Sequence, residues 1–486
     1  MADGKFVKDK VRENLSLSVA ADRTGLVFHR VFTAAGQDPL ESVVWQKRSA
    51  VIRNEKGEIV FEQHDVEAPS FWSDMALTVV VSRYFRGTPG TPERESSVRD
   101  MLRRVVDTIA QWGVEQGYFS SEEDSEAFRE ELMFLVLHQK ASFNSPVWFN
   151  VGVDPVPQCS ACFIISVEDT MESILHWYTQ EGRIFKGGSG SGINVSKLRS
   201  AREALSGGGT ASGPLSFMKA ADASAGVIKS GGKTRRAAKM VVLNVDHPDI
   251  LDFIRSKALE EKKVQALVNA GYDGSLDGEA YSTVAFQNSN HSVRLTDDFM
   301  KAVEKNENWQ TRLVVTGEIA DTYRATDLLE EIARAAHACG DPGLQFDTTI
   351  NRWHTCPETA PIRSSNPCSE YMHVDDSACN LASLKVTAFM EDGSFRTDTF
   401  RHAVDVMITA QDIIVDKASY PTPAIARNSM SMRALGLGVA DLGAFIMSMG
   451  LPYDSDTGRN WAAAISAIMA GEAYTQSARL ASVRRP

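Results

Sequence analysis

The sequence predicts an α/β protein in which a mostly helical N-terminal region precedes a parallel sheet or barrel. Three observations support this prediction. Apolar residues recur at three- and four-residue steps in residues 70–143, which is the spacing of helices. From residue 162 onward, short apolar runs alternate with helical patterns. With 486 residues and 43% hydrophobic side chains, the chain has the material for one large enzyme core with a helical attachment, or for two to three domains.

The N-terminal part is expected to consist of two sections. Residues 1–25 are polar with dense charges, which predicts a mobile N-terminus. Residues 26–150 are expected to form a mostly helical domain, although short apolar runs separated by turn signals predict a few strands before residue 66. The expected helices are 72–84, 98–112 and a third that ends near His138.

Residues 151–486 are expected to form an α/β barrel domain, in which loops at strand ends carry the chemistry. Residues 252–283 show no clear pattern. The expected strands are 162–167, 192–195, 240–245, 293–295 and 379–386. The expected helices are 170–185 with Asp169 or Thr170 as its cap, 214–228, one that begins at Pro248, 327–337, 405–414, 432–449 and 461–480.

Composition narrows the class of protein. The formal net charge of −12, from 51 basic and 63 acidic residues, argues against a nucleic-acid or anionic-membrane partner. The N-terminus lacks an apolar signal core and no run is long enough to cross a bilayer, so a cytoplasmic protein is expected. Six cysteines are too few for a disulfide scaffold, and clustered cysteines in a reducing compartment indicate metal or redox work. Cys339 and Cys356 are expected to be structural.

The segment from Ser364 to Glu370 concentrates reactive side chains. Asn366, Cys368 and Glu370 are two residues apart, so an extended or turning segment directs them to one side. A carboxylate can act as general base or acid, an amide can orient a hydroxyl, and a thiol suits nucleophilic or one-electron chemistry. Pro367 favours a loop. The alternative is a polar surface loop with an ordinary buried cysteine.

Two further loops could contact a ligand. The glycines of residues 186–192 permit close backbone approach, although the segment lacks a Walker pattern and could equally be a flexible entry to a strand. The second loop is basic, which suits phosphate contacts, although a solvated basic turn would have the same composition. Its cations are Lys229, Lys233, Arg235 and Arg236.

The remaining cysteines are distributed along the chain. Cys159 and Cys162 have the spacing of zinc ribbons and dithiol oxidoreductases, but a zinc site needs two more ligands at similar spacing, so zinc is poorly supported. A distributed set fits better, with Cys162 at the head of an early strand, Cys379 at the head of a late strand and Cys368 on a loop between them.

The chain resembles the catalytic chain of ribonucleotide reductases, and among them the adenosylcobalamin-dependent class II enzymes. The resemblance implies a ten-stranded α/β barrel of two half-barrels, with a finger loop that carries a radical cysteine. It extends from about residue 72 to 480 and rests on ALTVVVSRYFRG (76–87), FNSPVWFN (143–150), QCSACF (158–163), residues 187–198, residues 231–240, NVDHPDI (244–250), NPCSE (366–370) and ACNLASL (378–384).

The resemblance implies catalytic roles for residues of the site. Cys368 matches the thiyl radical that removes the 3′ hydrogen of the ribose. Glu370 matches the base that takes the 3′-hydroxyl proton, and Asn366 matches the amide that holds the ribose hydroxyls. Cys162 and Cys379 match the pair that supplies two electrons and ends as a disulfide.

It also implies binding residues. Ser145 resembles a substrate-contacting position, whereas Cys159 has no matched role. The effector region and specificity loop are matched by Asp169, Lys197, Lys229, Lys233, Arg235 and Arg236.

The function implied is reduction of ribonucleotides, expected as diphosphates, to 2′-deoxyribonucleotides for DNA synthesis. Adenosylcobalamin would bring its own metal, so no protein metal site is expected. Partners would be deoxynucleotide or ATP effectors, a thioredoxin-like dithiol reductant and a second copy of the chain. The resemblance stops near residue 480, so the second half-barrel is expected to be incomplete, with a separate C-terminal half as a further partner. The alternatives are a class I-type large subunit with a radical-generating partner and a non-catalytic nucleotide-binding fragment.

Overall fold

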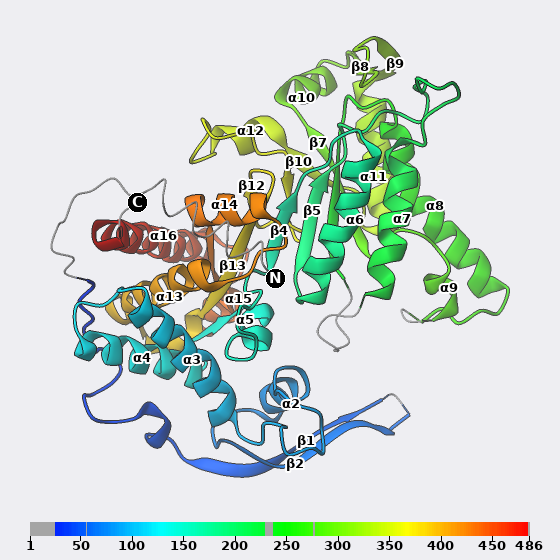
Figure 1. Ribbon diagram of the computed structural model, residues 1–486. Helices are drawn as coiled ribbons and strands as arrows, with labels where there is room; N and C mark the ends of the chain where they lie inside the picture. Colours follow the sequence, from blue (N-terminus) through cyan, green and yellow to red (C-terminus); the bar gives the residue numbers. More distant parts are fainter. Residues whose placement is uncertain (1–24, 55, 229–236, 276–277, 485–486) are drawn as a thin grey trace. The chain divides into compact units, whose positions relative to one another are not determined.

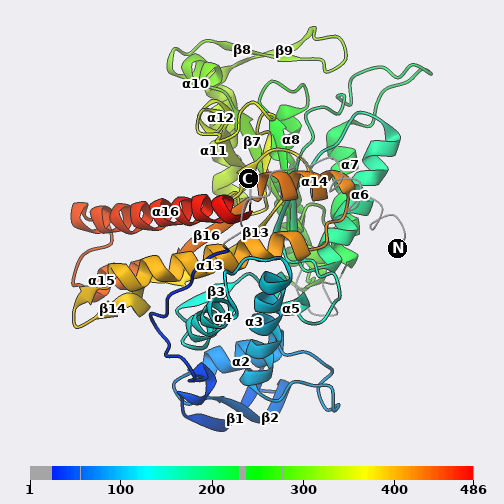
Figure 2. The ribbon, with the colours of Figure 1, turned by 60° about the vertical axis from the view of Figure 1, so that its left-hand side comes forward.

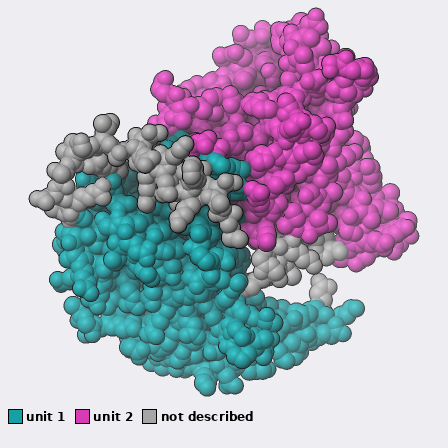
Figure 3. All heavy atoms as spheres, viewed as in Figure 1, with its two compact units in different colours: residues 1–160, 380–423, 430–486 teal, residues 161–379, 424–429 magenta. Residues whose placement is uncertain are grey.

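The computed structural model describes residues 25–54, 56–228, 237–275 and 278–484 (Figure 1). The chain divides into two compact units, which Figure 3 distinguishes by colour. Unit 1 contains residues 1–160, 380–423 and 430–486, and unit 2 contains residues 161–379 and 424–429. Within the described residues, no helix is both long enough and apolar enough to span a membrane.

Unit 1 is mainly helical, as the apolar spacing predicts. The expected face of helix α3 (Val98–Glu115), from Val98 to Ile109, is buried, and Ser97 caps the helix by accepting a hydrogen bond from the Arg99 amide at 3.0 Å. The other elements of the N-terminal part are η1 (Pro39–Glu41), β1 (Trp45–Arg53), β2 (Ile59–Pro69), α2 (Asp74–Arg83), α4 (Glu122–Leu137), β3 (Ala141–Phe143) and α5 (Ser145–Asn150).

The C-terminal residues supply the rest of unit 1. The long helices α13 (Thr397–Lys417) and α16 (Asp456–Arg484) lie side by side (Figure 2). One apolar cluster joins residues of α3, α4 and α13, so segments about 300 positions apart share a core. The remaining elements are η3 (Val386–Phe389), β14 (Met390–Glu391), β15 (Ser394–Phe395), β16 (Leu435–Ala440) and α15 (Leu442–Ser448).

The helix expected at 432–449 is wrong in its first half. The segment contains strand β16, which pairs in parallel with β13 (Ser377–Lys385), with Leu435 opposite Asn380. The apolar residues of 435–440 alternate with Gly436 and Gly438, so a strand pattern lies inside a window that also contains helical spacing. Pairing with a strand about 55 positions earlier decides between the two, and only α15 in the second half is helical.

Unit 2 is the expected parallel sheet with helices. Its strands lie in the order β10, β7, β6, β5, β4, all parallel, and the first residues of β13 pair antiparallel with β4. Helices α6, α7, α8 and α11 gather along the same side of these strands (Figure 1). The strands are β4 (Cys162–Ile165), β5 (Gly190–Asn194), β6 (Lys239–Asn244), β7 (Ser289–Leu295) and β10 (Gly343–Phe346).

The connections of unit 2 contain one hairpin that local pattern did not locate, and the helix expected to begin at Pro248, which continues into the unassigned segment. Strands β8 (Asn308–Arg312) and β9 (Ile319–Arg324) pair with each other, and α8 (Ile250–Asn269) occupies much of the unassigned segment. Thr170, one of two expected caps, accepts from the Ser173 amide at 3.2 Å and begins α6. The helices are α6 (Met171–Lys186), α7 (Gly213–Val227), α9 (Glu279–Ser282), α10 (Asp297–Glu304), α11 (Ala325–Cys339), α12 (Asp347–Arg352) and, in part, α14 (Pro423–Met432).

Candidate active site

The segment that holds Cys368 is the tip of a small hairpin. Its two strands are β11 (Ser364–Ser365) and β12 (Met372–His373), which pair antiparallel. The side-chain oxygen of Asn366 accepts a hydrogen bond from the backbone amide of Tyr371 at 2.9 Å. The backbone amide of Asn366 donates to the Tyr371 carbonyl at 3.1 Å. Ser369 has φ of 67°, so the chain reverses sharply directly after Cys368. The segment is therefore a closed turn rather than an extended strand.

Both polar neighbours of Cys368 in the motif contact Cys162. The side-chain amide of Asn366 donates to the Cys162 sulfur at 3.1 Å. The Cys162 thiol in turn donates to the Glu370 carboxylate at 3.4 Å. Residues about 200 positions apart in the chain thus meet, as a shared pocket requires.

Cys162 lies directly opposite Cys379. The two are paired in the antiparallel register of β4 and β13, and they are not joined in a disulfide. Side chains opposite each other in such a pair share one face, with Cα atoms about 4.5 to 5.5 Å apart. Disulfides need a Cα separation of about 4.4 to 6.8 Å, so these two thiols can join without movement of the backbone.

Burial keeps both of these thiols protonated. It raises the pKa of Cys162 well above the ordinary value, and the nearby Cys379 and Glu370 raise it further. Burial and the Glu370 carboxylate also raise the pKa of Cys379. Because a buried thiolate without a cationic partner is unfavourable, the pair suits donation of hydrogen rather than attack as thiolates.

Cys368 differs from these two cysteines because it is exposed. The turn therefore carries one accessible thiol within a few residues of a carboxylate and an amide that already contact a buried dithiol. One-electron chemistry at the exposed sulfur and two-electron chemistry at the buried pair could act on one bound molecule.

Two other residues named from the sequence lie in unit 1. Ser145 is the first residue of α5, and its hydroxyl is 3.0 Å from the Tyr84 hydroxyl. Cys159 is fully buried, and burial raises the pKa of its thiol. A contact between Ser145 and substrate stays a prediction.

The expected effector residues are only partly described. Asp169 accepts from Arg199 at 2.5 Å, and Lys197 pairs with Glu168, so two ion pairs lie just beyond the ends of β4 and β5. The cations of the basic loop, Lys229, Lys233, Arg235 and Arg236, lie outside the described residues.

Sequence reasoning missed the ion-pair partner of Asp169 and the contact of two glycines with the hairpin. Arg199, the partner of Asp169, has no distinguishing local pattern. The glycines of residues 186–192 were noted for close backbone approach, and the structure places Gly190 and Gly192 within β5, against the hairpin. Only their lack of side chains signalled this role.

Two family models match the chain. Residues 160–486 match the model described as "Ribonucleotide reductase, barrel domain". Residues 46–139 match "Class II vitamin B12-dependent ribonucleotide reductase". Together they cover most of both the α/β part and the helical N-terminal part.

Curated relatives carry the corresponding names. The vitamin B12-dependent ribonucleotide reductase of Streptomyces clavuligerus is 52% identical over 468 residues, covering 95% of this chain and 49% of that protein. The protein of the same name from Rhodopirellula baltica is 50% identical, covering 99% of this chain and 49% of the relative. A vitamin B12-dependent ribonucleoside-diphosphate reductase of Mycobacterium tuberculosis is 33% identical, covering 84% of this chain and 55% of the relative. The chain thus spans about half the length of these relatives.

Proposed function

The chain belongs to the class II, vitamin B12-dependent ribonucleotide reductases, and from this premise we propose that it carries the radical and dithiol chemistry of ribonucleotide reduction. One observation supports the proposal most directly. Asn366 and Glu370, on either side of Cys368, both contact Cys162, which lies opposite Cys379. The same premise makes a class I-type large subunit the less favoured alternative.

Adenosylcobalamin is the cofactor that the family implies, and when bound it supplies radical chemistry that can remove a hydrogen atom from a thiol. The exposed Cys368 fits this group, because the reacting sulfur is open to a cofactor that approaches from outside the chain. The carboxylate of Glu370 is placed to hold the proton of a ribose hydroxyl, and the amide of Asn366 to orient the ribose.

The buried pair balances the reaction. Cys162 and Cys379 give up two electrons and two hydrogens and form one S–S bond, while the 2′-hydroxyl leaves as water and a C–H bond replaces it. Their protonated state at neutral pH supplies the hydrogens that this step consumes. An external dithiol, such as a thioredoxin-like protein, would then reduce the disulfide by exchange.

The substrate we propose is a ribonucleoside diphosphate, in keeping with the name of the Mycobacterium tuberculosis relative. Asp169 and Lys197 are proposed to contact a deoxynucleotide or ATP effector together with the basic loop. Ser145 is proposed to contact substrate. A homodimer acting in the cytoplasm for DNA synthesis completes the proposal.

The test is deoxyribonucleotide formation from ribonucleoside diphosphates with adenosylcobalamin and dithiothreitol. The purified chain is assayed alone and mixed with a polypeptide that supplies the part of the relatives it does not match. Turnover in either sample, abolished by Cys368→Ala and also by Cys162→Ser, is the expected result. Thermal stabilisation by deoxynucleotides without any turnover would instead establish a nucleotide-binding protein without this chemistry.

A further inference from the structure

The hairpin that carries Cys368 rests on a strand without side chains. A Cβ atom built on Gly192 would lie 1.6 Å from the Ser365 carbonyl oxygen, and one built on Gly190 would lie 2.6 Å from the Pro367 ring. Real Cβ atoms do not approach backbone that closely. Neither glycine has a positive φ, so contact with the hairpin, rather than backbone conformation, excludes a side chain at both positions.

Neighbouring strands hold the hairpin by side-chain amides. Asn290 of β7 donates to the Pro367 carbonyl at 2.8 Å, directly before Cys368. Gln345 of β10 donates to the Ser365 hydroxyl at 2.8 Å. Strands β5, β7 and β10 therefore all contact Ser365 or Pro367, the residues that lead into Cys368.

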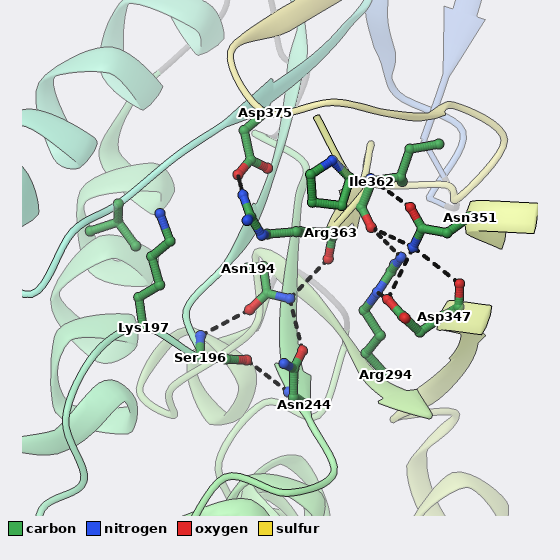
Figure 4. Close-up of a pocket in the computed structure, with 12 residues that line it drawn as sticks. Asn194, Ser196, Lys197, Asn244, Arg294, Asp347, Asn351, Ile362, Arg363 and Asp375 are labelled. Carbon is green, nitrogen blue, oxygen red and sulfur yellow. Dashed lines mark hydrogen bonds and ion pairs between the residues drawn. The ribbon is translucent and has the colours of Figure 1, made fainter. Parts of the chain in front are cut away.

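The foot of the hairpin is anchored in the same way (Figure 4). Asn194, at the end of β5, donates to the Arg363 carbonyl at 2.9 Å, and buried Arg294 donates to the Ile362 carbonyl at 2.5 Å. These residues also line a cavity of about 270 Å³ beside the hairpin. The segment from residue 362 to 367 thus has a partner on the sheet at almost every position.

We propose that Gly190, Gly192 and Asn290 are positioning residues for Cys368. Together they form a support for the hairpin, and this support sets the distance and direction of the thiol from the sheet. This inference rests on the proposed function. A sulfur that must receive a radical and then meet one ribose hydrogen needs placement to a fraction of an ångström. The bare strand sets how closely the hairpin approaches, and Asn290 sets where its tip lies along the strands.

Asn290 separates this role from mere folding. The residue is exposed, and its side-chain amide reaches the hairpin at the peptide next to Cys368. Loss of one such hydrogen bond costs too little stability to unfold the chain. A change at Asn290 therefore reports on the position of the turn.

The experiment compares Gly192→Ala, Gly190→Ala, Asn290→Ala and the isosteric Asn290→Asp. Gly343→Ala is the matched control. Gly343 is also a strand glycine of this sheet, but its added Cβ would lie 3.2 Å from the Ser292 hydroxyl and 3.9 Å from the His291 carbonyl oxygen, with no closer contact to backbone. Cys368 alkylation by iodoacetamide is followed by mass spectrometry without cofactor or substrate. The rates of Cys339 and Cys356 serve as internal references, and circular dichroism checks the fold.

We expect the Cys368 rate relative to the references to change at least 5-fold in Gly192→Ala and at least 2-fold in both Asn290 variants, with no change in Gly343→Ala. In the sample that turns over, kcat should fall about 10-fold or more while KM changes little. Unchanged Cys368 alkylation rates in the folded Asn290 variants would contradict the proposed positioning role, even if Gly192→Ala fails to fold. Absence of turnover contradicts the proposed function alone, because alkylation needs none.

Discussion

Both units of the molecule bury apolar side chains, but unit 2 buries more of the polar and charged ones. Unit 1 is organised around one apolar cluster, which includes fully buried Phe128 and Ile413. Unit 2 buries charged and polar groups within and beneath its sheet, among them Lys239, Glu181 and His291. Apolar side chains offer no reactive groups. Buried polar groups can react, but they lower the stability of the fold unless each has a hydrogen-bond or ion-pair partner. The difference indicates that unit 2 gives up some stability to hold polar groups in fixed positions.

The largest effect is expected where unit 1 loses apolar packing. Phe128 is fully buried, with ring centroids 5.2 Å from Phe28 and 5.0 Å from Phe119. Phe128→Ala should lower the free energy of unfolding by about 4 kcal/mol, since it leaves a cavity in the core. Urea denaturation measures the change. Tyr474→Ala, which removes a side chain that is 69% exposed, should cost less than about 0.5 kcal/mol. Equal effects of the two changes would contradict a dominant apolar core.

The next effect tests whether unit 2 depends on buried charge. Lys239 pairs with Glu181 at 2.7 Å, Ser191 donates to the same carboxylate at 3.0 Å, and the Lys239 ammonium lies 5.2 Å from the Trp177 ring. Glu181→Gln should destabilise by about 3 kcal/mol, because it leaves a buried ammonium without its counter-charge. Hydrogen exchange should locate the loss in β5 and β6.

The double variant Glu181→Gln, Lys239→Met is the control for that prediction. It removes both charges and should recover most of the stability. A double variant as unstable as the single one would mean that packing, rather than charge pairing, governs this part of unit 2.

One carboxylate of unit 1 should make the folded state more stable in acid. Burial beside Glu472 raises the pKa of Asp405 to about 7, from an ordinary value of 3.8. Between about pH 4 and 7 the folded state then holds a proton that the unfolded state has lost, so stability falls as pH rises through this window. Asp405→Asn should remove about 2 kcal/mol of that fall. Exchange protection of α13 and α16, corrected for intrinsic rates, measures it. Protection that rises with pH in the parent chain would contradict the assignment.

Acidity should act on unit 2 in the opposite direction. Burial lowers the pKa of His291 well below 6.5, and the charges of Lys257 and Lys239 lower it further. Below about pH 6.5 the histidine binds a proton in the unfolded chain but not in the folded chain. The free energy of unfolding therefore decreases as pH falls. At pH 5.5 the loss is about 1 kcal/mol, seen as faster exchange in β6 and β7.

His291→Gln should reduce that loss without abolishing it. Burial also lowers the pKa of His247, which therefore contributes with the same sign. Exchange in β6 and β7 that stays unchanged down to pH 5.5 would contradict this assignment.

Local sequence patterns located much of this architecture. The buried face of α3 follows directly from apolar residues at three- and four-residue steps, and Cys162 begins a strand as expected. Asn366, Cys368 and Glu370 were identified together, because their side-chain types and spacing indicate chemistry even before their neighbours are known. Strand β16 was missed, because its partner lies elsewhere in the chain.

By itself, the sequence determined many of the helices and strands, which residues to propose as reactive, and the family. These properties depend on side-chain type and on neighbours within one or two turns of chain. The tertiary structure alone decided that Cys379 lies opposite Cys162, that Glu181 meets Lys239, and that Gly190 and Gly192 support the hairpin. Such contacts join residues from tens to about 200 positions apart, and they are set by strand register and packing, for which a single segment carries no local signal.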